Sequence, residues 1–127
     1  MRIFIEPIAG NPVAQVAIAT VLLLIALDVV VGFTGAAITK TISSAKMRAG
    51  LLHKLMEFAA IALADIVDGA LLGGFDVIDG SPLLVAVCAY LAVMEAASVL
   101  ELIAKYNPDL AGAGVFTFVT KKDAEDD

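Results

Sequence analysis

The sequence contains one cysteine, one histidine and no tryptophan, and these shortages exclude several kinds of site. With Cys88 as the only thiol, an intramolecular disulfide is excluded. Because Cys88 lies in an apolar run, we expect an inert, packed side chain. His53 has no Cys/His cluster around it and no nucleophile–base spacing, so the sequence predicts no metal site, no cofactor and no enzyme.

Charge is also scarce, and its scarcity excludes an ordinary soluble domain. The chain has 127 residues, of which 17% are charged and 61% are hydrophobic, and its mean hydropathy is +0.96. Soluble domains are typically about 25% charged and 45–50% apolar. A domain of this size cannot bury so much apolar surface in water. We therefore predict an integral membrane protein whose partner is the lipid bilayer.

Three long apolar runs are present, at Val13–Ile38, Leu55–Phe75 and Leu83–Ala104. About 20 apolar residues suffice for a helix to cross the hydrocarbon layer. The runs predict an all-α fold with three transmembrane helices in residues 1–108. Residues 109–127 end in an acidic stretch, and we expect a polar, disordered tail there.

Helix boundaries are marked by prolines and possible caps. Asn11 can cap a helix that has Pro12 in its first turn, and Asn107-Pro108 predicts the end of the third helix. The short VFTFV run at 115–119 is β-prone, and its role stays open.

Basic residues gather between the first two apolar runs, at Lys40, Lys46, Arg48 and Lys54. Short loops rich in Lys and Arg stay cytoplasmic. This connector therefore predicts an N-out, C-in topology, in which Lys54 and the neighbouring His53 lie at the membrane boundary. The cluster is explained by topology, so we predict no nucleic-acid partner.

Acidic residues lie inside all three apolar runs. In the first run, Asp28 shares a narrow helical face with Gly32, Gly35 and Thr39. Small residues on one face allow a second helix backbone to approach closely. This face is either an ordinary helix-packing seam or part of a polar surface shared between protomers.

The second and third runs carry more acids on restricted arcs. Buried carboxylates near mid-bilayer cost about 2.5–3.5 kcal/mol on insertion scales, so they should not face lipid as lone charges. No basic residue is expected at their depth, which predicts protonation, hydrogen bonding to another helix, or a wet cavity in place of an internal ion pair. The residues concerned are Glu57, Asp65 and Asp68 in the second run, and Glu95, Ser98 and Glu101 in the third.

These residues resemble the phage lysis holins of the toxin-secretion/phage-lysis type. The resemblance covers roughly residues 24–108, and its most specific part is the E-x-x-S-x-L-E pattern from Glu95 to Glu101. The chain departs from the family where Met94 and Leu102 replace asparagines that are common there. The other matching residues are Leu27, Asp28, Gly32, Ser43, Ser44, Gly50, Lys54, Asp65, Tyr90 and Pro108.

The resemblance implies a holin, which oligomerises with itself in the bacterial cytoplasmic membrane and opens timed lesions. An endolysin, or a secreted toxin, then passes without required direct contact. We predict that the carboxylates and small residues form the pore or oligomer interface: Asp28, Gly32, Gly35, Asp65, Asp68, Glu95, Ser98 and Glu101. The same acids could instead hydrogen-bond within a static bundle.

Two other kinds of function remain open from the sequence. A small ion- or proton-conducting subunit would also carry intramembrane acids, and a passive scaffold would cause no change in permeability.

Overall fold

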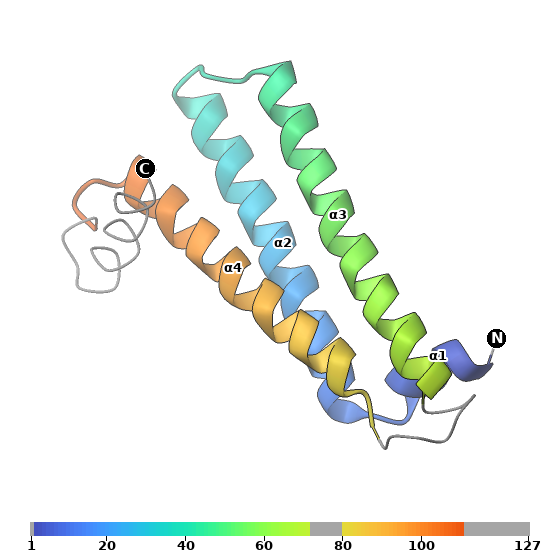
Figure 1. The fold of residues 1–127 in the computed structure, drawn as a ribbon. Coiled ribbons are helices and arrows are strands. Elements are labelled where there is room, and N and C mark those ends of the chain that lie inside the picture. The colour runs from blue at the N-terminus through green and yellow to red at the C-terminus, as the bar shows by residue number, and fades with distance from the viewer. Residues whose placement is uncertain (1, 72–79, 111–127) are drawn as a thin grey trace, which may run out of the picture.

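The computed structural model describes residues 2–71 and 80–110, and within them the regular structure is entirely helical. The helices are α1 (Arg2–Ala9), α2 (Pro12–Ile38), α3 (Ser44–Gly69) and α4 (Pro82–Tyr106). Consecutive long helices run in opposite directions, and α4 packs against both α2 and α3 (Figure 1). The short α1 lies at the end of the bundle where α3 finishes and α4 begins (Figure 1). The predicted all-α fold is confirmed.

The local sequence explains where α2 and α4 begin and end. The Asn11 side chain accepts hydrogen bonds from the backbone N–H groups of Val13 (3.1 Å) and Ala14 (3.3 Å). These groups have no partner inside the helix, so the cap stabilises its start. α4 ends at Tyr106, directly before Asn107-Pro108. Both predicted boundaries are confirmed.

The boundaries of α3 differ from the prediction. The basic connector is mostly helical, because α3 begins at Ser44, where the Ser43 hydroxyl accepts a bond from the Lys46 N–H at 3.5 Å. Ala, Lys, Met and Arg are good helix formers, and residues 40–43 are enough to reverse the chain. α3 ends at Gly69, and the expected end of the second run at Phe75 lies outside the described residues.

Two helices in the described part of the chain, α2 and α4, are long and apolar enough to cross a membrane. Three had been predicted, but α3 contains too many charged residues to have the composition of a typical membrane span. Of the most apolar stretches of α2 and α4, only 11% and 28% of the residues are buried within the chain. A core helix of a soluble protein would be mostly buried, so these exposed apolar surfaces favour a lipid environment.

The apolar core is small and lies where α2, α3 and α4 meet. Cys88 belongs to this core and is fully buried, as expected for a packed thiol. The other buried members are Ala14, Val21, Ile25, Ala64, Leu84 and Leu91. The predicted tail at 109–127 and its VFTFV segment lie almost wholly outside the described residues.

Candidate functional site

A cluster of charged side chains lies between the three long helices, centred on Lys54 of α3. The Lys54 ammonium is 2.9 Å from the Asp28 carboxylate of α2 and also binds the Glu95 carboxylate of α4. Glu57, one turn further along α3, places its Oε2 atom 3.8 Å from the same ammonium. We call Asp28, Lys54, Glu57 and Glu95 the central ion cluster.

The central ion cluster is withdrawn from the surface of the bundle. The exposed side-chain fractions are 11% for Lys54, 16% for Asp28, 4% for Glu57 and 2% for Glu95. Removing such groups from water costs several kcal/mol per ion unless they are paired. The pairing by Lys54 therefore allows two acids from other helices to lie inside the bundle.

This cluster corrects one prediction about Lys54, because no internal ion pair was expected. Its assignment to the membrane boundary as a topology determinant stays a prediction. Lys54 lies well inside α3, and its partners Asp28 and Glu95 lie near the middle of their own helices. The error followed from treating 40–54 as a connector. The three-residue spacing of Lys54 and Glu57 would have placed both on one helical face.

His53 and Glu57 were not among the predicted site residues, yet the structure adds them to this region. His53 Nε2 lies 2.9 Å from Glu57 Oε1, one helical turn away. A nitrogen of His53 and carboxylate oxygens of Glu57 and Glu95 all lie within 4.8 Å of one another. The sequence signal for this pair is the i, i+4 spacing of the two residues on α3.

At the opposite end of α3, Asp68 acts as a cap for α4. Its fully buried carboxylate accepts bonds from the N–H groups of Leu83 (3.3 Å) and Leu84 (2.6 Å). An anion at a helix N-terminus satisfies free N–H groups and interacts favourably with the helix dipole. The expectation of hydrogen bonding to another helix is confirmed for Asp68. For Asp65, the buried Oδ1 atom has no hydrogen-bond partner among the described residues.

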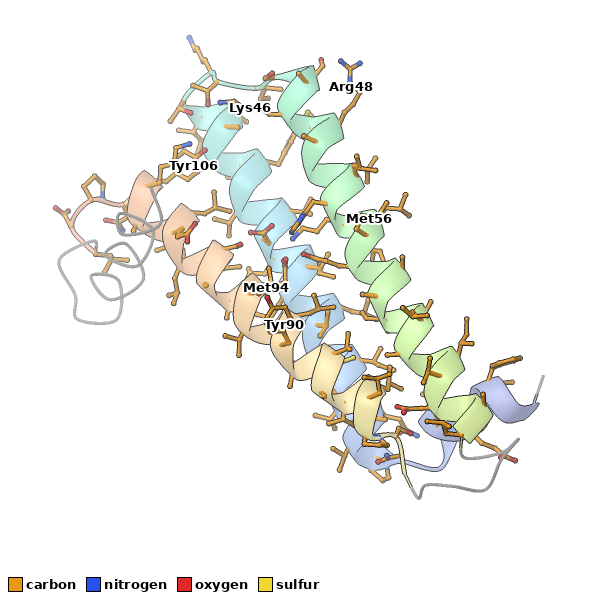
Figure 2. All side chains as sticks on the ribbon, viewed as in Figure 1. Lys46, Arg48, Met56, Tyr90, Met94 and Tyr106 are labelled. Atoms are coloured by element: carbon orange, nitrogen blue, oxygen red, sulfur yellow. The ribbon has the colours of Figure 1, made fainter. Side chains whose placement is uncertain are left out.

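The predicted glycine face of α2 packs against α4 of the same chain. A Cβ atom added to Gly32 would lie 3.5 Å from the Leu102 side chain, whereas one added to Gly35 would overlap the Tyr106 ring. Figure 2 shows Tyr106 beside the C-terminal part of α2. Within the chain, this face is therefore a helix-packing seam. A polar surface shared between protomers was the other interpretation, and a single chain does not test it.

A shallow groove beside the central ion cluster contains two more of the predicted residues. Ser98 and Glu101 line it together with Asp28, Leu102 and Lys105. The E-x-x-S-x-L-E pattern therefore lies partly on the α2–α4 seam, with Glu95 turned into the cluster and Ser98 and Glu101 beside it.

The remaining basic residues of the predicted connector lie at the end of the bundle where α2 joins α3. Lys46 and Arg48 lie in the first turns of α3 and are exposed (Figure 2). Lys40, which has a positive φ of 56°, helps to reverse the chain between the helices. The orientation of this end relative to a membrane stays a prediction.

Comparison with known proteins identifies a matching protein family, but no individual protein or structure that matches. No curated protein and no solved structure matches the chain. A sequence model described as "Bacteriophage holin family" matches residues 12–110, which include α2, α3 and α4. That family is a non-enzymatic, membrane pore-forming class, in agreement with the prediction that the chain is not an enzyme. Because this match covers most of its length, the chain belongs to the bacteriophage holin family.

Proposed function

We propose that the chain oligomerises in the bacterial cytoplasmic membrane and opens timed lesions through which an endolysin, or a secreted toxin, passes. The observation that carries this proposal is the central ion cluster, in which Lys54 joins acids from α2 and α4. Polar groups are enclosed by helices whose outer surfaces are apolar, which suits a compact form in lipid. Separation of the helices would present the same polar groups to water.

The proposal includes α3 as a third membrane-spanning helix. Three of its charged side chains, those of Lys54, Glu57 and Asp68, are buried against the bundle. Its outward positions include Leu55, which is 58% exposed, and Leu63, which is 63% exposed. The mean hydropathy of such a helix counts its buried charges together with its apolar outer face. Composition alone therefore underestimates the ability of the helix to cross a bilayer.

Labelling of single cysteines tests the number of spans and the N-out, C-in orientation. Two single-cysteine variants, Ser44→Cys and Asp79→Cys, would be made in a Cys88→Ala background. Each would be treated with a membrane-impermeant maleimide in intact and in lysed spheroplasts. We expect Asp79→Cys to react from outside and Ser44→Cys to react only after lysis. Reaction of both from the same side would contradict a transmembrane α3.

Inducible expression in bacteria tests lesion formation directly. Membrane potential and release of a folded cytoplasmic reporter would be followed together, with co-expressed endolysin in a parallel culture. We expect a delay followed by abrupt loss of both, and lysis where endolysin is present. Unchanged potential and reporter, with the protein confirmed in the membrane, would contradict the proposal and favour a scaffold.

A small-ion or proton conductor is the second candidate, and the central ion cluster favours it in one respect. No basic residue was expected beside the intramembrane acids, yet Lys54 pairs with Asp28 and Glu95, as a charge relay would require. The same expression experiment separates the two. A conductor would abolish the membrane potential while the folded reporter stays inside the cell.

We further propose that Asp28, Asp65, Asp68 and Glu95 form a two-state surface that is hydrated after opening. In the closed bundle, Asp28, Asp68 and Glu95 have polar partners. Asp→Asn and Glu→Gln substitutions at these positions remove the charge with little change in size. We expect them to shift the time of lysis, with the largest shifts at Asp28 and Glu95 because their charges pair with Lys54. Unchanged timing in all four variants would leave the acids a static structural role.

A further inference from the structure

The charges of the central ion cluster do not balance within the chain. One ammonium, that of Lys54, faces the carboxylates of Asp28, Glu57 and Glu95. When all three are ionised and the neighbouring His53 imidazole is neutral, two negative charges remain without a counter-charge in a region largely removed from water. Such charges are costly unless they are paired or coordinate a metal ion.

Glu57 identifies the place where a positive charge is missing. Its side chain is 4% exposed, and neither of its carboxylate oxygens accepts a hydrogen bond of good geometry from the residues that the structure describes, although His53 Nε2 lies 2.9 Å from Oε1. Lys54 is 3.8 Å away and lies closer to Asp28 and Glu95. A buried carboxylate without a hydrogen bond is uncommon and needs a partner of some kind.

The atoms around Glu57 have the chemistry of a metal site. His53, Glu57 and Glu95 each offer one ligand atom, and these atoms lie within 4.8 Å of one another. Ligands of tetrahedral Zn²⁺, with bonds of about 2.0–2.2 Å, stand about 3.3–3.6 Å apart. Around an ion, ligand atoms up to 4.8 Å apart would move closer together, and the 2.9 Å separation of His53 Nε2 and Glu57 Oε1 would widen slightly. Lys54 binds Oε2 of Glu95, which leaves that carboxylate a second oxygen for a metal.

We propose that His53, Glu57 and Glu95 bind one divalent transition-metal ion, for which Zn²⁺ is the best match. One imidazole and two carboxylates form a three-residue ligand set that leaves a fourth position for water. The two charges of the ion, added to that of Lys54, equal the three negative charges of the cluster. The ion would join α3 to α4 through Glu57 and Glu95, while His53, which is 60% exposed, lies on the open side of the site.

Zn²⁺ titration of the purified full-length chain in detergent tests this proposal. The protein carries a tag without histidine, and binding is measured by competition with a fluorescent zinc indicator. We expect one ion per chain. Co²⁺ in place of Zn²⁺ should give the intense visible absorption of tetrahedral coordination.

Two substitutions make the test specific. His53→Ala should weaken Zn²⁺ binding by more than about tenfold, because changes in the outer shell alone cost 10–100-fold. His53 is exposed, so its replacement should preserve the helix content measured by circular dichroism. Glu6→Gln, which removes an exposed carboxylate on α1, is the matched control and should bind normally. Absence of saturable binding by the helical wild-type chain, or equal binding by His53→Ala, would overturn the proposal.

Discussion

The Lys54 ammonium of α3 lies 2.9 Å from the Asp28 carboxylate of α2, and both side chains are largely buried. Because Lys54 also binds Glu95, the two residues of this pair are not equivalent. Loss of Asp28 leaves Lys54 with a second carboxylate. Loss of Lys54 leaves several carboxylates close together without their cation.

The first prediction follows from this asymmetry. Lys54→Met should lower the free energy of unfolding by about 3–5 kcal/mol, the range for breaking a buried pair. Asp28→Asn should have a clearly smaller effect, because Glu95 still neutralises the lysine. Unfolding of the detergent-solubilised chain, followed by circular dichroism, measures both. Equal effects would contradict a cluster centred on Lys54.

The second prediction concerns the two acids near the end of α3. Asp68→Ala removes the acceptor for Leu83 and Leu84 and leaves a buried N–H group unpaired, which should cost about 1–3 kcal/mol. Asp65→Asn is the matched control. The Asp65 carboxylate has a buried oxygen without a hydrogen-bond partner in the described segments, so its neutralisation should be harmless or stabilising. A larger loss of stability in Asp65→Asn than in Asp68→Ala would contradict the assignment of Asp68 as the cap of α4.

The third prediction concerns the contact between α2 and α4. Gly35→Ala should displace the Tyr106 ring and destabilise the bundle by about 1–3 kcal/mol, the usual cost of overpacking. Gly32→Ala should be tolerated, because its new methyl group would be at an ordinary contact distance from Leu102. Tyr106→Ala in the Gly35→Ala chain should recover part of the loss in thermal unfolding. Additive losses in the double variant would exclude the proposed contact.

The fourth prediction is a stabilising substitution. Gly50 is exposed within α3, and an added Cβ would meet no atom within 4 Å. Gly50→Ala should therefore raise the free energy of unfolding by about 0.5–1 kcal/mol, because alanine is the better helix former. The measurement is made on detergent-solubilised chains. A loss of stability would indicate that another surface contacts this position.

Much of the helical architecture could be predicted from the sequence, since its boundaries depend on local chemistry. Asn11-Pro12 and Asn107-Pro108 mark ends of α2 and α4 through capping and the loss of backbone donors, both of which can be read from neighbouring residues. The early start of α3 was missed because basic residues were taken as evidence for a loop. In the structure, Ser44 already begins the helix.

The candidate site was predicted only in part, because its contacts join residues that are distant in sequence. Periodicity placed Glu57, Asp65 and Asp68 on one restricted arc of their helix. Glu57 and Asp68 are buried, and Asp65 is partly buried. Periodicity could not show that Lys54 reaches Asp28 and Glu95, since this depends on the relative position of three helices. A hydrogen bond from Leu84 to Asp68 likewise requires the packed bundle.

The uneven covering of α3 has a mechanical consequence. Every residue from Ser44 to His53 is exposed, whereas Lys54, Glu57 and Asp68 are buried against neighbouring helices. The part of α3 from Lys54 onward thus packs against other helices, whereas the part from Ser44 to His53 does not. From Asp68 to Ser44 the helix is about 36 Å long at 1.5 Å per residue, so a tilt of about 10° about Asp68 moves the bare tip by roughly 6 Å. Any such tilt would move the Ser44 end of α3 furthest, and the ion pairs of Lys54 with Asp28 and Glu95 would oppose it.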